Sequence, residues 1–431
     1  MEQYSATIAD ITCSTNVKEV VTMKVVMCSD AYWPRVNGVS VSVESFSRAL
    51  IKAGHQVVII CSFYPEAQTV ESMANPVIEK PVNQYDPIII RVPSFPLPIS
   101  KEDRVAKFHK WFWISKQLNV FDPDIIHINS EFVIGEFGFY YAKLHSLPVV
   151  YTFHTLWEDY AINYIPYVPE FILRFVARNL IKNMAKRAST IIAPSQQIND
   201  VLKRYNVKSP VYLLPTGVDP EIFNNPPEKV EEFRKTLEEK YPVLAGKRIL
   251  LFAGRVGKEK NISFILKMMP GILLREPDVV LILAGNGPDL PSFEEEARSL
   301  GVFDHCIFTG YLERTDLSLV YAMADIFTFP SCTETQGLVT IEAMLSGTPV
   351  VAIGEMGTIA VMGGNNGGFM VKNDLAEFTS RVLELLENPD LYNEKVEEAK
   401  KHAQAWTIGT MTSRLQTIYY DTIKAYQTPK K

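Results

Sequence analysis

The chain has 431 residues, of which 47% are hydrophobic and 21% are charged, and its formal net charge is −6. This length exceeds one ordinary hydrophobic core, so we expect two domains of about 200 residues each. No apolar run reaches the ~18 residues that suggest a transmembrane helix, and residues 1–215, with 21 Lys and Arg against 19 Asp and Glu, are too weakly basic for wholesale nucleic-acid binding.

Residues 1–22 are polar and patternless, and they precede a second methionine, Met23, where the first strand starts. They lack the apolar stretch of a signal peptide, so we predict a disordered extension or a misassigned start. The cysteines show no metal-like spacing, and three of them fall in apparent strands, which favours a reduced, cytoplasmic setting. They are Cys13, Cys28, Cys61, Cys306 and Cys332.

Short apolar runs alternate with helical patterns through the first half of the chain, as in βαβ units. This alternation favours a parallel sheet covered by helices and a first domain over residues 23–214. The predicted strands are 24–28, 56–61, 88–92, 124–128, 149–153, 190–193 and 211–214.

Prolines and charged residues then interrupt the pattern, and we interpret residues 215–247 as a hinge or linker. A second alternation over residues 248–405 predicts a similar α/β domain. Its strands are 248–253, 279–284, 305–309, 326–329 and 350–353. Two such domains would bind ligands at the carboxyl ends of their strands, in a cleft between them.

Two carboxylates, Glu334 and Glu342, lie eight residues apart across a predicted strand-to-helix turn, with the helix beginning near Gly337. A helix N-terminus offers unpaired N–H groups to a phosphate. A carboxylate beside a phosphate would be repelled, so Glu334 is understandable if it faces sugar hydroxyls while cations elsewhere neutralise the phosphates. The segment therefore predicts a site for an anionic sugar compound.

Candidate cations follow strand 248–253, at the carboxyl edge of the same sheet. Arg255 and Lys260 could offset a diphosphate there, although solvated loop charges are the alternative, and Asn261 is expected to cap the next helix. In the first domain, Gly38 ends the loop before the first helix and would let the backbone approach a phosphate, or simply start the helix. This loop lacks GxGxxG, which counts against a dehydrogenase.

Five patterns together resemble the large retaining glycosyltransferase family usually numbered four. They are the loop Pro34-Arg-Val-Asn-Gly-Val39, Thr152-Phe-His-Thr155, Gly254-Arg255 with Lys260-Asn261, Gly285-Asn-Gly-Pro288, and the Glu334/Glu342 pair in an E-x7-E arrangement. The likeness runs from about Met23 to the C-terminus. It is strongest to the subgroup that moves glucose onto diacylglycerol, through Thr-Glu-Thr-Gln-Gly-Leu and Thr-Phe-His-Thr.

This resemblance implies an α/β fold with two facing Rossmann-like domains (GT-B type), an interdomain cleft, and a last helix, 406–431, that packs back on the first domain. Two departures affect the comparison. The first loop has one glycine instead of two, which leaves donor placement less certain, and Thr216 stands where the hinge often carries Asn.

The resemblance also implies residue roles. Arg255 and Lys260 would bind the diphosphate of a nucleotide sugar, Gly38 would approach it from the other domain, and Glu342 would take the ribose hydroxyls. Glu334 would hold the donor hexose with the backbone of Thr335, Gln336, Gly337 and Leu338. His154, near the reacting side, completes a predicted catalytic set of His154, Glu334, Arg255 and Lys260, although a lone histidine after a strand is more often a hydrogen-bonded core residue.

Retention without an obvious nucleophile favours front-face displacement, in which the leaving phosphate takes the acceptor's proton. Double displacement with Glu334 as nucleophile is the alternative. No paired carboxylates suggest a divalent-metal site, so we expect neither a metal nor another cofactor. The acceptor side is less defined: Tyr32, Trp33, His127 and Trp157 are candidates, although packing explains aromatic residues there equally well.

Residues 171–187 carry basic side chains at fourfold spacing and no acidic residue, which predicts a helix that lies on an anionic membrane, or an ordinary helix with a solvated face. The basic residues at this spacing are Arg174, Arg178, Lys182 and Lys186, with Arg187 in addition, and another face holds Ile172, Leu173, Val176, Leu180 and Met184. Residues 104–113 repeat the theme, with Trp111 and Trp113 as aromatic anchors.

The expected function is transfer of a hexose, in first place glucose from UDP-glucose, to a membrane lipid such as 1,2-diacylglycerol, by a cytoplasmic enzyme peripheral to the inner face of the cell membrane. Alternative acceptors are phosphatidylinositol, a soluble sugar or a sugar phosphate, and GDP-mannose is an alternative donor. The same scaffold could also serve an epimerase, a phosphorylase or a non-catalytic nucleotide-sugar binding protein. The sequence leaves the oligomeric state open.

Overall fold

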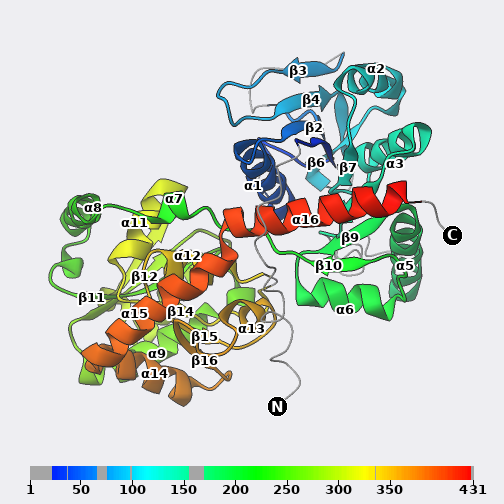
Figure 1. Ribbon diagram of the computed structural model, residues 1–431. Helices are drawn as coiled ribbons and strands as arrows, with labels where there is room; N and C mark the ends of the chain where they lie inside the picture. Colours follow the sequence, from blue (N-terminus) through cyan, green and yellow to red (C-terminus); the bar gives the residue numbers. More distant parts are fainter. Residues whose placement is uncertain are drawn as a thin grey trace.

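The computed structural model describes residues 22–35, 37–65, 75–97, 100–154, 169–334 and 336–428, which form two α/β domains (Figure 1). The first contains an eight-stranded sheet and the second a six-stranded sheet. The predicted fold class, two Rossmann-like domains with parallel sheets, is confirmed.

The first sheet has the strand order β10-β9-β8-β7-β1-β2-β4-β3. Its strand pairs are parallel, except that β3 runs antiparallel to β4, and β5 pairs with β6 as a separate hairpin. The elements are β1 (Lys24–Ser29), α1 (Gly38–Lys52), β2 (Gln56–Ser62), β3 (Val77–Glu79), β4 (Ile88–Val92), β5 (Ser94–Leu97), β6 (Ser100–Ala106), α2 (Trp111–Phe121), β7 (Ile125–Ile128), α3 (Val133–His145), β8 (Val149–Thr152), α5 (Glu170–Arg187), β9 (Thr190–Ala193), α6 (Gln196–Arg204) and β10 (Val211–Leu213).

Helices cover both faces of this sheet. Val25 and Met27 belong to a core cluster with residues of α1 and α16, whereas Val26 and Cys28 cluster with residues of α2, α3, α5 and α6. Burial on both faces explains why the strands read as continuous apolar runs. Figure 1 shows α2, α3 and α5 on the side of this domain that faces away from the second domain.

The second sheet is parallel throughout, with the order β13-β12-β11-β14-β15-β16. Its domain contains α7 (Pro220–Phe223), α8 (Pro227–Lys240), β11 (Arg248–Ala253), α9 (Ile262–Arg275), β12 (Val279–Ala284), α10 (Leu290–Ser299), β13 (Cys306–Gly310), α11 (Arg314–Met323), β14 (Ile326–Phe329), α12 (Leu338–Leu345), β15 (Val350–Ile353), α13 (Gly357–Met362), β16 (Gly368–Val371), α14 (Leu375–Glu387) and α15 (Pro389–Ala403).

The segment interpreted as a linker, 215–247, differs from that expectation, because most of it folds as α7 and α8. Phe223 and Leu237 are buried in the core cluster that contains the second sheet, and α8 contacts α11. Pro220 and Pro227 stand at the first positions of these helices, where proline is tolerated because no N–H is needed there. The prolines that suggested a broken segment therefore start two helices.

The chain passes between the domains twice, and the two passages pair with each other. Val218 N donates to Trp406 O at 3.0 Å, and Ile408 N donates to Val218 O at 2.8 Å. After the second passage, α16 (Ile408–Gln427) returns to the first domain and packs on α1, as Figure 1 shows in red. Helices α6 and α13, which follow the carboxyl ends of β9 and β15, contact each other across the domains.

Every predicted strand is present, and the described part of the chain contains four further strands that were not predicted. These are β3, β5, β6 and β16, which are short, polar or glycine-containing and so lack a clear apolar pattern. Within the described ranges, no helix is both long enough and apolar enough to cross a bilayer.

Candidate active site

The predicted donor residues converge at the carboxyl edge of the second sheet. Lys260, on the turn after β11, places Nζ 2.8 Å from Oε2 of Glu334, which follows β14. Both side chains are mostly buried, with 18% and 20% of their surfaces exposed. Burial raises the pKa of Glu334, but Lys260 and two backbone N–H groups outweigh it and hold that pKa below its usual value.

The second oxygen of Glu334 points to the start of α12. Oε1 accepts from the backbone N–H groups of Gln336 and Gly337, each at 3.4 Å. Gly337 has φ of +70°, a left-handed conformation that favours glycine at the turn into the helix. Gln336 also reaches the interdomain passage, since its Oε1 accepts from Thr216 N at 3.2 Å. Leu338 is the first residue of α12, and Thr335 lies outside the described residues.

Arg255 lies on the same edge but remains available to a ligand. Its side chain is 69% exposed, and Nη1 is 4.0 Å from Oε1 of Glu259. Close backbone packing fixes its loop: a Cβ on Gly285 would lie 1.8 Å from Gly254 O, and one on Gly287 would lie 2.0 Å from Val256 O. Because Gly285 and Gly287 have no side chain, the loops after β11 and β12 can pack directly against each other.

Glu342 faces inward from α12. Its Oε2 accepts from Tyr321 OH at 3.2 Å, and its Oε1 lies 3.8 Å from Arg314 Nη2. Burial raises the pKa of this carboxyl, while Arg314 and Tyr321 oppose the shift. Sequence reasoning missed Arg314 and Tyr321 because nothing local to α11 links them to Glu342.

Asn261 takes the predicted N-cap position of α9, but its side chain does not cap the helix. Its backbone is left-handed, with φ of +57°. Its Nδ2 donates instead to Pro330 O at 3.2 Å, which ties the β11 loop to the β14 loop.

Gly38 begins α1 behind a capping box formed by Asn37 and Ser40. It is exposed, and a Cβ added there would meet no described atom within 4 Å, so packing does not require a glycine.

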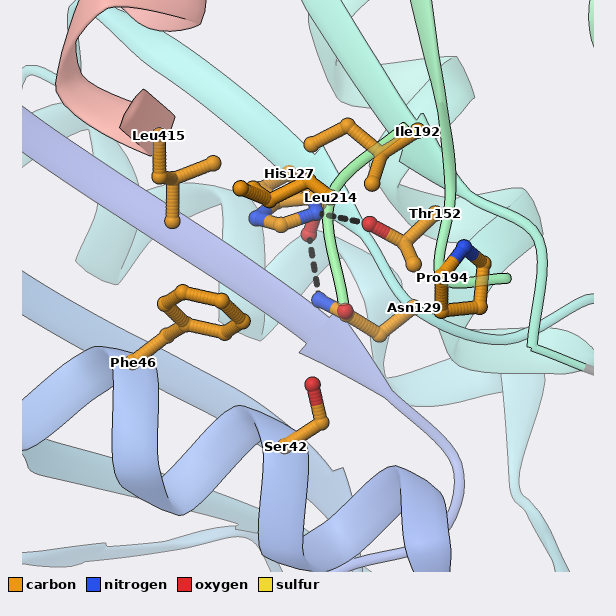
Figure 2. A pocket seen from close by; sticks show the side chains of 9 residues that line it. All are labelled: Ser42, Phe46, His127, Asn129, Thr152, Ile192, Pro194, Leu214 and Leu415. Carbon is orange, nitrogen blue, oxygen red and sulfur yellow. Dashed lines mark hydrogen bonds between the residues drawn. The ribbon is translucent and has the colours of Figure 1, made fainter. Parts of the chain in front are cut away.

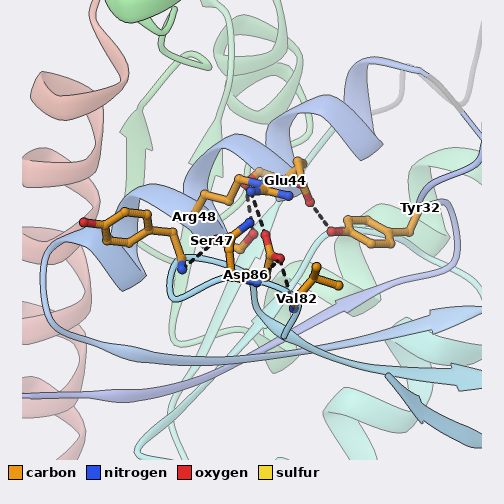
Figure 3. A network of polar contacts seen from close by, with 8 residues as sticks. Tyr32, Glu44, Ser47, Arg48, Val82 and Asp86 are labelled. Atoms are coloured by element: carbon orange, nitrogen blue, oxygen red, sulfur yellow. Dashed lines mark hydrogen bonds and ion pairs between the residues drawn. The ribbon is translucent and has the colours of Figure 1, made fainter. Parts of the chain in front are cut away.

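A polar network fixes α1 to the neighbouring loops (Figure 3). Glu44 accepts a hydrogen bond from Tyr32 OH and pairs with Arg48, and Arg48 Nη1 lies 2.7 Å from Asp86 Oδ1.

A small pocket with mixed polar and apolar walls lies in the first domain, near the carboxyl ends of β7, β8 and β9 (Figure 2). His127 forms one wall, with Nδ1 2.6 Å from Tyr419 OH and Nε2 2.7 Å from Thr152 Oγ1. Its ring is buried, and burial lowers its pKa to about 3. His127 is thus a hydrogen-bonded core residue and not an exposed acceptor contact. The pocket is lined by Ser42, Phe46, His127, Asn129, Thr152, Ile192, Pro194, Leu214 and Leu415.

His154 follows β8 and retains partial exposure. Its Nε2 lies 3.2 Å from Asn129 Oδ1, and desolvation of the ring lowers its pKa to about 4. A neutral imidazole at this edge can donate or accept a hydrogen bond, but it holds no charge near pH 7.

Among the aromatic candidates, Tyr32 is 2% exposed and bonded to Glu44, so the packing alternative applies to it. Trp33 is 40% exposed, and Trp157 lies outside the described residues. Trp111 and Trp113 pack against the core, contrary to their predicted role as membrane anchors, because α2 turns them toward the sheet. Phe108 and Phe112 are exposed there in their place.

Helix α5 presents apolar and basic side chains together. Leu173 and Met184, predicted for a separate apolar face, are buried in the core. Ile172, Val176 and Leu180 are exposed, as are Phe171 and Phe175 at 72% and 67%. The basic residues Arg174, Arg178 and Lys186 are exposed and Lys182 is partly exposed; the guanidinium of Arg178 also lies 5.7 Å from the Tyr205 ring.

The two α/β domains with parallel sheets share the GT-B fold of solved glycosyltransferases that match this chain. Residues 36–222 match the family model Glycosyltransferase Family 4, and residues 233–402 match Glycosyl transferases group 1. The alpha-monoglucosyldiacylglycerol synthase of Streptococcus pneumoniae is 33% identical over 93% of this chain and 86% of its own length. The chain therefore belongs to glycosyltransferase family 4, and it is a hexosyltransferase.

Further relatives agree with this assignment. An alpha-monoglucosyldiacylglycerol synthase of Acholeplasma laidlawii is 26% identical over 93% of this chain and 98% of its own length. Among solved structures, Anabaena HepE in complex with UDP and glucose has a TM-score of 0.67 at 16% identity, covering 93% of this chain and all of that one. A Rickettsia africae glycosyltransferase has a TM-score of 0.70 at 18% identity, covering 94% and 99%. At these identities the structures establish the fold alone.

Proposed function

We propose that this enzyme transfers a hexose, glucose in first place, from UDP-glucose to a membrane lipid such as 1,2-diacylglycerol, with retention at the anomeric carbon and without a divalent metal. The names of two relatives, both glucosyldiacylglycerol synthases, support the glycolipid product. The main structural observation in favour of a lipid acceptor is that α5 exposes aromatic and basic side chains together.

On the donor side, the positive charges of Arg255 and Lys260 would balance the negative charge of the diphosphate. The N–H groups at the start of α12 would add the partial positive charge of that helix end. Glu334 would accept hydrogen bonds from hexose hydroxyls, and buried Glu342 would do the same for the ribose. The pairing of Glu342 with Arg314 and Tyr321 supports a positioning role, because it holds the carboxylate in one orientation.

The reaction we propose is front-face displacement. The bond from the anomeric carbon to the diphosphate breaks first, and an oxocarbenium-like centre forms. The acceptor hydroxyl adds from the same face and gives its proton to the departing phosphate oxygen. Glu334 is ill suited to be a nucleophile, since Lys260 and backbone N–H groups already occupy its two oxygens.

The membrane surface we propose is the outer side of α5, together with Phe108 and Phe112 near α2. Aromatic rings at the lipid interface and lysines or arginines near anionic headgroups are the combination that holds peripheral proteins on bilayers. On this basis the enzyme would work at the inner face of the cell membrane.

Radiolabelled donor tests the proposal. UDP-glucose, UDP-galactose and GDP-mannose would each be incubated with diacylglycerol, phosphatidylinositol or a soluble sugar phosphate, with and without a chelator. We expect label in the organic phase from UDP-glucose and diacylglycerol, unaffected by the chelator. Label confined to the aqueous phase would overturn the lipid acceptor, and complete loss in chelator would overturn metal independence.

A further inference from the structure

Asn129 connects His154, which was predicted to lie near the reacting side of the donor, to the core of the first domain. It directly follows β7, its backbone N–H donates to Cys28 O at 2.8 Å, and only 3% of the residue is exposed. Its carboxamide lies between His127 O and the ring of His154, at 3.5 and 3.2 Å. Figure 2 shows the bond to His127, with Asn129 at the wall of the pocket.

The contact with His127 O favours one orientation of the carboxamide, because only that orientation makes a hydrogen bond there. The carbonyl oxygen of His127 only accepts, so it requires the Nδ2 group of Asn129 opposite it. The reverse orientation would put two oxygens against each other. Oδ1 of Asn129 therefore faces His154 Nε2, and it can only accept.

We infer that Asn129 is a positioning residue that holds His154 in the tautomer with its proton on Nε2, so that Nδ1 is free to accept a hydrogen bond from a substrate hydroxyl. This inference rests on the proposed function for the identity of the substrate. In this form His154 orients a hydroxyl of the bound sugar or acceptor and transfers no proton.

The surroundings of the ring agree with this assignment. Desolvation lowers the pKa of His154 to about 4, so the neutral ring carries a single proton at pH 7. The titratable group that interacts with it among the described residues is His127, whose pKa is about 3 and which is neutral as well. Both ring nitrogens of His127 are engaged by Tyr419 on α16 and Thr152 on β8, so His127 does not compete for Asn129 Oδ1.

Nitrogen NMR of the 15N-histidine-labelled full chain tests the tautomer without substrate, and His154→Gln assigns the signal. Between about pH 6 and 8, where an ordinary histidine titrates, we expect His154 to show a protonated Nε2 and an unprotonated Nδ1. Asn129→Leu should lose this tautomer preference. A wild-type His154 that carries its proton on Nδ1, or an unchanged preference in Asn129→Leu, would overturn the inference.

The variant Asn129→Asp tests whether Asn129 positions His154 or only fills space in the core. A carboxylate opposite Nε2 should raise the pKa of His154 by roughly 1 to 3 units, so that Nδ1 becomes protonated as the pH falls. Starting from about 4, this puts the pKa of His154 at about 5 to 7, so the kcat/KM of this variant should fall as the pH drops through that range, whereas Asn129→Leu should lose about tenfold at every pH. Asn119→Asp, on the exposed side of α2, is the matched control and should keep the wild-type profile.

A wild-type profile in Asn129→Asp would also overturn the inference. If the wild-type chain transfers no sugar while the NMR result stands, the proposed function fails and the tautomer assignment survives.

Discussion

Lys260 and Glu334 form an ion pair across two loops that lie 74 residues apart in the sequence, with 2.8 Å between Nζ and Oε2. The cation expected to meet the diphosphate thus holds the carboxylate expected to meet the hexose. Because both are mostly buried, losing one leaves the other with an unpaired charge. The pair is therefore more than two separate contacts to the donor.

Lys260→Ala should lower turnover by roughly a hundredfold or more, since removing one preorganised donor of positive charge from such a site costs about 3 to 4 kcal/mol. Steady-state kinetics with saturating donor measures this loss. Lys258→Ala is the matched control, because Lys258 is exposed on the same turn. Near-normal turnover in Lys260→Ala would contradict the assignment.

The variant Gly38→Ala should change the binding of the donor without weakening the stability of the fold. A Cβ meets no described atom within 4 Å, and alanine favours helices more than glycine, so the melting temperature should be unchanged or slightly higher. If the backbone at Gly38 approaches the diphosphate, the added methyl group should raise the donor KM by about tenfold, equivalent to about 1.4 kcal/mol. An unchanged KM would show that this glycine serves only to start the helix.

The exposed aromatic residues of α5 should govern membrane binding. In Phe171→Ser/Phe175→Ser, sedimentation with anionic liposomes should fall by more than tenfold, because each buried Phe contributes about 1.5 to 3 kcal/mol. Leu274→Ser, which changes a residue that is 87% exposed on the second domain, should bind like the wild type.

Salt provides the second part of this membrane test. Binding that weakens as salt is added would reflect the basic residues of α5. A wild-type chain that fails to bind at low salt, or a double variant that binds equally well, would contradict the membrane surface.

Gly217→Ala should disturb the interdomain passages. A Cβ there would lie 2.4 Å from Ile408 Cα and 2.7 Å from Ile408 N, and both of these are backbone atoms that cannot give way locally. We expect thermal unfolding at a temperature several degrees lower and, in small-angle scattering, an altered distance between the domains. Gly409→Ala is the control, because a Cβ at Gly409 meets nothing within 4 Å; equal behaviour of the two variants would contradict this role for Gly217.

How much of the molecule the sequence predicts depends on the range of the interactions. Local apolar runs were enough to predict most strands and the order of the two domains. Motifs at the strand ends were enough to predict the donor residues. Pairings between distant segments leave no local pattern: Arg314 with Glu342, Thr216 with Gln336, and Asn129 with His154 are examples. The faces of α2 were mispredicted because Trp and Phe are equally apolar, and only packing decides which ring is buried.

Acid should destabilise the first domain through histidines whose pKa is lowered by desolvation, His127 and His154 with the largest shifts and His55 in the same direction. Burial lowers the pKa of His127 to about 3 and that of His154 to about 4, against 6.5 in the unfolded chain. The unfolded chain therefore binds more protons below pH 6.5. The free energy of unfolding should fall as the pH drops from 6.5 towards 4, by up to about 1.4 kcal/mol per pH unit for each histidine.

Asp30 has the opposite effect on the free energy of unfolding as the pH falls, but it does not cancel the loss caused by the histidines. Burial raises its pKa from 3.8 to about 6, so the folded state takes up its proton first and gains stability as the pH falls through that window. This single carboxyl is set against three histidines whose pKa is lowered, so it offsets only part of the loss. Urea unfolding at a series of pH values should thus show a net loss below pH 6.5, and His127→Gln should flatten it. His145→Gln, at an exposed position on α3, should keep the wild-type slope, and a His127→Gln slope equal to it would contradict the assignment.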